Sequence, residues 1–170
     1  MKTTRKESVY QIDETDKKIL KFLVKNARMP YLEIARECGV SGAAIHQRVK
    51  KMENNGVITG SRLLVKPSTL GLNVCAYIAV SLSNSDLEST IEALRQIPEI
   101  VECHFITGEF GMLLKIYCSD NDHLMNVICN QLTNIPGIRK TETWLSLSQA
   151  IDRQIWVDNY MEKSKKKKKK

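Results

Sequence analysis

The side chains of this chain that could do chemistry are concentrated between residues 41 and 51, in the run SGAAIHQRVKK. His46 and Gln47 can hydrogen-bond to base edges, and the cations after them can pair with phosphates or guanine. The small residues that begin the run would let a helix end approach DNA closely. A merely solvated helix face is the alternative, and a charge run standing alone would favour it. The candidate DNA-contacting residues here are Ser41, Gly42, Ala43, His46, Gln47, Arg48, Lys50 and Lys51.

Two short helices joined by a tight turn are predicted to position this run. The first covers residues 31–38, and Gly39 follows, where a left-handed helix end prefers glycine. Ser41 stands where a hydroxyl can cap the next helix. That helix has one apolar stripe at helical spacing, formed by Ile45, Val49 and Met52. The arrangement predicts a helix-turn-helix whose second helix enters a DNA major groove, which favours DNA binding over the solvated face.

A preceding helix and a following hairpin are expected to complete this domain. Asp13 is the predicted cap of the first helix, and Glu14 and Asp16 suit the positive end of its dipole. Residues 57–66 are rich in strand-forming residues around a Thr-Gly-Ser turn, which predicts a hairpin that serves as a wing. Arg62 on that wing is the ninth candidate for contact with DNA.

The second half of the chain carries an internal repeat. The pattern Ile-Pro-x-Ile occurs at residues 97–100 and again at residues 135–138. Alternating apolar residues predict strands, and helical spacing between them predicts a helix before each copy. The predicted strands cover residues 74–82, 100–107, 112–118 and 138–148. The order β-α-β-β-α-β predicts an α+β, ferredoxin-like sheet with both helices on one face.

One face of that sheet would remain open. Tyr77, Trp144 and Leu145 supply apolar surface on it or at an edge, which indicates pairing with a second copy of the chain. Between the second and third strands lies Gly108-Glu109-Phe110-Gly111, which as a bare motif is only a turn. A Gly-x-x-Gly loop that clamps nucleic acid joins helices rather than strands, so that reading is rejected.

Charge divides the chain into parts. Residues 1–66 hold 14 Lys and Arg against 7 Asp and Glu, whereas residues 67–162 hold 5 against 12. A basic front is suited to a polyanion, and an acidic middle would be repelled by one. Residues 163–170 add 7 lysines in a tail that cannot fold and that could strengthen DNA binding or have no function.

Composition excludes several classes of protein. The five cysteines are scattered without a Cys-x-x-Cys pair, as expected for reduced thiols, and a zinc site from Cys103, His104, Cys118 and His123 would match no standard spacing. No signal peptide or membrane-spanning run is visible, which indicates a soluble cytoplasmic protein without membrane contact. No nucleophile–base pair or phosphate-binding loop is found, so neither an enzyme nor a cofactor is expected.

Taken together, these motifs resemble the Lrp/AsnC, or feast/famine, family of transcriptional regulators. The resemblance covers about residues 12–153. It rests on Ile12-Asp13-x-x-Asp16-x-x-Ile19-Leu20, Asn26-Ala27-Arg28, Ile34-Ala35, Gly39-Val40-Ser41, Arg48-Val49-Lys50-Lys51-Met52-Glu53, Gly56-Val57-Ile58, Gly108-Glu109-Phe110 and Leu113-Leu114-Lys115. Each motif alone is weak, but the set is specific.

The resemblance implies a winged helix-turn-helix domain (1–66), a linker (67–72) and an amino-acid-responsive RAM domain (73–162). It also implies dimers that assemble further, often to octamers, and that bind double-stranded DNA. The implied effector, an amino acid, would bind between dimers near Gly108, Glu109, Phe110, Gly111 and Met112. The family often has Asp where this chain has Gly111, so an architectural DNA-binding protein without an effector stays as the alternative.

Overall fold

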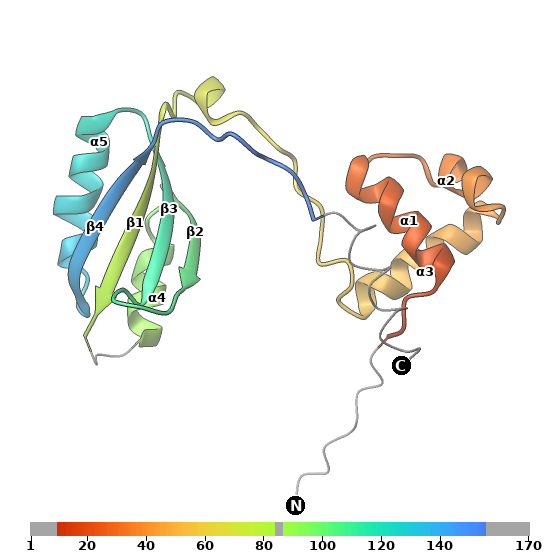
Figure 1. Ribbon diagram of the computed structural model, residues 1–170, viewed down its shortest axis with the longest axis horizontal. Helices are drawn as coiled ribbons and strands as arrows, with labels where there is room; N and C mark the ends of the chain where they lie inside the picture. The colour runs from red at the N-terminus through yellow and green to blue at the C-terminus, as the bar shows by residue number, and fades with distance from the viewer. Residues whose placement is uncertain (1–9, 84–86, 156–170) are drawn as a thin grey trace, which may run out of the picture. The chain divides into compact units, whose positions relative to one another are not determined.

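The structure, a computed structural model, describes residues 10–83 and 87–155 (Figure 1). The chain divides into two compact units. The described residues up to Leu63 belong to the first unit, and Leu64–Ile151 form the second. The predicted lysine tail, residues 163–170, lies outside the described residues. In the described parts, no helix is long and apolar enough to cross a membrane.

Three helices build the first unit, and their ends follow from local sequence. Helix α1 spans Glu14–Lys25, α2 spans Tyr31–Cys38 and α3 spans Gly42–Asn54. Gly39 ends α2 with φ at 68°, a left-handed conformation that favours glycine. The Ser41 hydroxyl then caps α3 by accepting a hydrogen bond from the Ala44 amide at 3.2 Å. The predicted helix-turn-helix is confirmed.

One apolar cluster holds these helices together. Ile45 and Met52 of α3 are fully buried, and Val49 is 4% exposed, as their helical spacing predicts. They pack against α1 and α2 through residues Ile19, Leu20, Ile34 and Ala35. Since this stripe lies on one side of α3, the opposite side of the helix is turned away from the core.

The predicted wing hairpin is wrong for this chain. No strand is formed between α3 and Pro67. The amide of Val57 donates to the Met52 carbonyl at 2.9 Å, so the start of the segment closes the end of α3 instead of pairing with another strand. Leu63 and Leu64 are 73% and 78% exposed. Strand-forming residues were present, but an isolated two-stranded hairpin is at best marginal, and no third strand supports it here.

The second unit contains an antiparallel sheet of four strands in the order β2-β3-β1-β4 (Figure 1). The strands are β1 (Val74–Leu82), β2 (Ile100–Phe105), β3 (Met112–Cys118) and β4 (Ile138–Ser146). The predicted β-α-β-β-α-β order is confirmed, although β2 and β4 end two residues earlier than predicted. A short 3-10 helix, Pro67–Leu70, precedes β1.

Both helical segments cover the same face of the sheet. Helix α4 spans Leu87–Arg95, and α5 spans Asn121–Asn126 before the chain continues as a π-helix and a 3-10 turn to Asn134. Their inward residues join one core with Ile78, Leu114 and other alternate residues of the strands. The repeat is structural: the amides of Ile100 and Ile138 close equivalent turns by donating to the carbonyls of Ile97 and Ile135.

The apolar residues predicted on the open face of the sheet or at an edge divide between these two places. Tyr77 of β1 lies directly opposite Trp144 of β4, on the side away from the core, and Trp144 is 47% exposed. Leu145 instead lies opposite Ala76, whose side chain belongs to the core cluster. Because neighbouring residues of a strand point to opposite faces, Leu145 lies on the helix-bearing side of the edge strand.

Candidate DNA-binding helix and effector loop

The outward side of α3 presents most of the residues predicted to contact DNA. Ala43, Gln47 and Lys50 follow one another at spacings of four and three residues, so they form one line along the helix. His46 and Lys51 flank this line, and all five side chains are exposed. Ser41 is exposed at the helix start, where Gly42 is half-buried and a Cβ added to it would lie 4.0 Å from Leu32 Cδ1.

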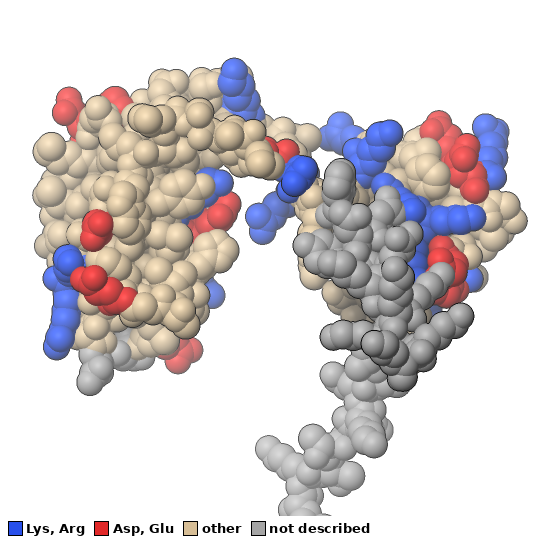
Figure 2. Space-filling view, in the orientation of Figure 1, with Lys and Arg blue, Asp and Glu red and all other residues tan. Residues whose placement is uncertain are grey.

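Positive charge accompanies this helix. On the visible face of the first unit, Figure 2 shows several Lys and Arg side chains close together, with acidic side chains beside them. His46 is held by an edge-on contact with the Tyr31 ring, with centroids 5.9 Å apart. Arg62 is exposed in the extended segment after α3, not on a wing. The arrangement offers hydrogen-bonding groups in line with phosphate-binding cations, as an α-helix in a major groove requires.

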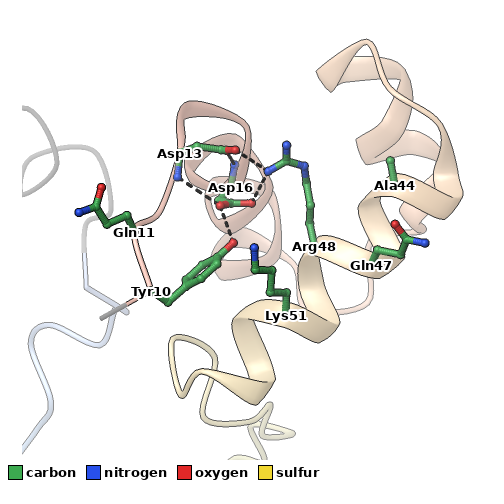
Figure 3. A pocket seen from close by; sticks show the side chains of 8 residues that line it. All are labelled: Tyr10, Gln11, Asp13, Asp16, Ala44, Gln47, Arg48 and Lys51. Atoms are coloured by element: carbon green, nitrogen blue, oxygen red, sulfur yellow. Dashed lines mark hydrogen bonds and ion pairs between the residues drawn. The ribbon is translucent and has the colours of Figure 1, made fainter. Parts of the chain in front are cut away.

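Arg48 differs from the other predicted contacts because it is engaged inside the unit. Its Nη1 donates to Asp13 Oδ2 at 2.6 Å and to Asp16 Oδ1 at 2.8 Å (Figure 3). Its side chain is 34% exposed, and that of Asp16 is 1% exposed. Hydrogen bonds first to Asp13 and then to Asp16 raise the pKa of Arg48. The pairing spans more than 30 residues, so the sequence predicted Asp13 only as a helix cap and Asp16 only as a partner of the helix dipole, not as partners of Arg48.

Tyr10 completes this cluster from the chain that enters α1. Its hydroxyl donates to Asp16 Oδ2 at 2.8 Å, and the ammonium of Lys51 lies 5.0 Å from its ring centroid. Burial, followed by the hydrogen bond to Asp16, raises the pKa of Tyr10 to about 12, so the phenol remains a donor at neutral pH. A shallow hollow of about 420 Å³ lies here, lined by Tyr10, Gln11, Asp13, Asp16, Ala44, Gln47, Arg48 and Lys51 (Figure 3).

The predicted effector loop connects β2 and β3 in the second unit. Gly108 has φ at 119°, which favours glycine, and the Gly111 amide donates to the Val80 carbonyl at 3.0 Å. Glu109 is exposed, and Phe110 is half-buried. Met112 differs from these residues because it is fully buried in the core, with its sulfur 3.8 Å from Cys103 Sγ. Its side chain therefore supports the loop from beneath and offers no surface to a ligand in this structure.

Lys140 of β4 is a residue of this site that the sequence analysis missed. Its ammonium donates to Glu109 Oε1 at 3.0 Å and lies 5.1 Å from the centroid of the Phe110 ring. A cation, a carboxylate and an aromatic ring thus meet at the tip of one loop. No motif in the sequence signals this contact, because Lys140 follows Glu109 by 31 residues and is brought to it by the order of the strands in the sheet. Among the described residues, no cluster of metal-ligating side chains could hold a metal ion.

A helix-turn-helix unit joined to an antiparallel α+β unit is the architecture of a DNA-binding regulator with a separate ligand-binding domain. Comparison with known families supports both parts. The Lrp/AsnC ligand binding domain matches residues 75–156, and the winged helix-turn-helix DNA-binding family matches residues 12–59. The chain belongs to the Lrp/AsnC family of transcriptional regulators.

Individual relatives agree with this assignment. The regulatory protein AsnC of Escherichia coli K12 is 38% identical over 86% of this chain and 97% of its own. The proline dehydrogenase transcriptional activator of Rhodobacter capsulatus is 35% identical over 83% of this chain and 94% of its own. These relatives are transcriptional regulators, so this chain falls in a family without enzymatic activity, as the sequence predicted.

Solved structures support the fold. The structure of E. coli AsnC covers 86% of this chain and 99% of its own, with 39% identity and a TM-score of 0.80. A transcriptional regulator from Neisseria meningitidis, solved in complex with L-methionine, covers 89% and 99% with 24% identity and a TM-score of 0.83. The latter likeness concerns the fold alone.

Proposed function

We propose that this regulator binds specific double-stranded DNA sequences through α3 and that an amino acid controls its assembly and DNA binding. The observation that carries the DNA-binding part is the outward line of Ala43, Gln47 and Lys50 on a helix whose other side is fixed in the core. In a dimer, two such helices would meet half-sites separated by one or more DNA turns. The residues that would bind phosphates are Lys50 and Lys51, together with Arg62 and the residues at the start of α3.

Base reading is assigned to Gln47 and His46. Replacing either with alanine is expected to remove roughly 1–3 kcal/mol of discrimination at one base position, because the amide or imidazole loses its hydrogen bond to a base edge. Selection of binding sites from a random DNA library by the wild type and by each variant measures this. An unchanged sequence preference in both variants would remove these two residues from base reading.

The amino-acid response is assigned to the loop between β2 and β3. What supports it is the convergence of Lys140, Glu109 and Phe110, since a zwitterion could offer its carboxylate to the ammonium and its ammonium to the carboxylate. The Neisseria regulator, which shares this fold, was solved in complex with L-methionine. The backbone at position 111 has room for a side chain larger than that of glycine, since a Cβ added to Gly111 would meet Leu82 at an ordinary van der Waals distance of 3.4 Å.

A panel of amino acids tests this response. DNA footprints and particle size are measured at fixed salt with and without each amino acid. One amino acid is expected to change both quantities, by a coupling on the order of 1–3 kcal/mol, and Lys140→Ala should remove the change while DNA binding persists. If DNA binds but no amino acid alters footprint or size, the chain acts as an architectural DNA-binding protein whose second unit serves assembly.

Self-association is assigned to the open face of the sheet. Trp144 and Tyr77 lie directly opposite each other on neighbouring strands of that face, and Trp144 is 47% exposed. Trp144→Glu is expected to shift the protein from a dimer or larger particle to a monomer, because it places a charge inside an apolar contact. Light scattering measures the mass. Leu145→Glu is the matched control, since Leu145 is 51% exposed on the same strand but lies on the other face. Equal masses for the wild type and Trp144→Glu would contradict the assignment.

A further inference from the structure

Asp16 is a buried carboxylate on which three residues of the first unit, Arg48, Tyr10 and Asp13, converge. Its Oδ1 accepts from Arg48 of α3, and its Oδ2 accepts from the Tyr10 hydroxyl at 2.8 Å and from the Asp13 amide at 3.2 Å. The Asp16 amide in turn donates to Asp13 Oδ1 at 2.8 Å. Because a buried carboxylate is tolerated only when its oxygens have partners, this geometry fixes where Arg48 must lie.

The cluster joins α3 to the beginning of the chain along one flank of the helix. Arg48 reaches the carboxylates of Asp13 and Asp16, and Lys51, three residues further along the same flank, lies over the Tyr10 ring (Figure 3). Residues three apart on a helix are neighbours on its surface. The polar cluster therefore contacts α3 at two side chains, Arg48 and Lys51, that lie nearly one helical turn apart.

The two kinds of contact constrain α3 differently. The apolar stripe of α3 holds the helix against the core, but apolar attraction is non-directional and tolerates a small roll about the helix axis. Hydrogen bonds from a guanidinium to two carboxylates depend on direction and distance, so they resist that roll. Gln47 lines the same hollow as Arg48 and precedes it in the helix, so its direction changes with any roll.

We propose that Asp13, Asp16 and Tyr10 act through Arg48 to set the rotation of α3, so that Arg48 is a positioning residue for base reading and not itself a DNA contact. This rests on the proposed function of α3. In the alternative, Arg48 would leave both carboxylates to reach a phosphate. The carboxylate of Asp13, which is half exposed at 51%, would then lie close to that phosphate and repel it.

Salt dependence and sequence preference separate the two roles of Arg48. If Arg48 is a positioning residue, Arg48→Gln leaves the slope of log affinity against log salt concentration unchanged. The ratio of the affinity for specific DNA to the affinity for non-specific DNA falls by roughly 10-fold, as expected when one base contact is misdirected. Lys50→Ala, the positive control, lowers the slope by about 0.9. A comparable loss of slope for Arg48→Gln would overturn the proposal.

The two possible roles of Arg48 predict effects of opposite sign on DNA affinity when its partner Asp16 is replaced. Asp16→Asn lowers specific affinity if the cluster positions α3, whereas it raises affinity if it only frees Arg48 for DNA. Glu14→Gln is the matched control, since it makes the same change of charge in the same turn of α1, where Glu14 pairs with Lys17. If Asp16→Asn does not fold, Tyr10→Phe removes only the hydroxyl and is expected to narrow the specificity ratio in the same direction. An unchanged ratio in folded Tyr10→Phe and Arg48→Gln would overturn the proposal.

The wild type is measured in the same series. Absence of any DNA binding by the wild-type chain at low salt would overturn the proposed function as a whole. Binding by the wild type together with a slope loss for Arg48→Gln would overturn only the positioning role. The two failures are therefore distinguishable.

Discussion

Replacing both Lys50 and Lys51 with alanine is expected to weaken binding to every DNA sequence by roughly 50-fold in 0.1 M salt. Both side chains are exposed at the end of α3 that follows its base-reading residues. Each ammonium that neutralises a phosphate releases a counterion and contributes about 0.9 to the salt slope, so the slope should fall by about 1.8. The measurement is affinity for a selected site and for random DNA across a salt series.

The same series contains its own controls. Lys25→Ala removes one lysine charge from the end of α1, as each single α3 variant does, and is expected to leave the slope unchanged. Lys50→Ala alone should account for half of the loss of slope, because each ammonium contributes the same amount, about 0.9. A selective loss for one sequence, with the salt slope preserved, would show that the two lysines read bases instead of phosphates.

Ile45→Ala is expected to cost about 2–5 kcal/mol of the free energy of unfolding of the first unit, through lost apolar burial and the cavity left behind. Ile45 is fully buried at the centre of the cluster that joins the three helices. For a unit of this size, such a loss lowers the melting temperature by roughly 8–40 °C. DNA binding should disappear at temperatures where the wild type still binds.

Leu32→Ala is the matched control for this core. Leu32 lies in the neighbouring helix α2, but its side chain is 60% exposed. Its replacement is expected to change the free energy of unfolding by less than about 1 kcal/mol, because the Leu32 side chain buries little apolar area when the unit folds. Equal losses for both variants would mean that the packing of α3 is not what stabilises the unit.

The sequence predicted the elements whose causes are local. Gly39 and Ser41 mark the turn because a left-handed residue and a hydroxyl cap are needed there, and Ile45 begins a stripe that repeats at helical spacing. The sheet was predictable for a similar reason: the two Ile-Pro-x-Ile segments close the same turn, and the alternation along β3 marks its buried side.

The features that the sequence did not predict depend on distant contacts. Arg48 looked like a phosphate contact because its partners are 32 and 35 residues away, at the start of α1. Lys140 was missed because β4 comes close to the β2–β3 loop only when the four strands assemble in the observed order. The wing was predicted from strand propensity and a Thr-Gly-Ser turn. Propensity expresses how well a residue fits a sheet, and residues 57–66 have no sheet to join.

The most direct test of the account is to locate the α3 side chain at position 47 on bound DNA. A photo-crosslinking side chain replaces Gln47, which is exposed, and the crosslinked nucleotides are mapped; the same group at Val24 of α1, which is 42% exposed, is the control. The account predicts crosslinks from position 47 to major-groove base edges within each half-site, and none to bases from position 24. An intact protein–DNA complex in which position 47 reaches no base would contradict the assignment of α3 as the recognition helix.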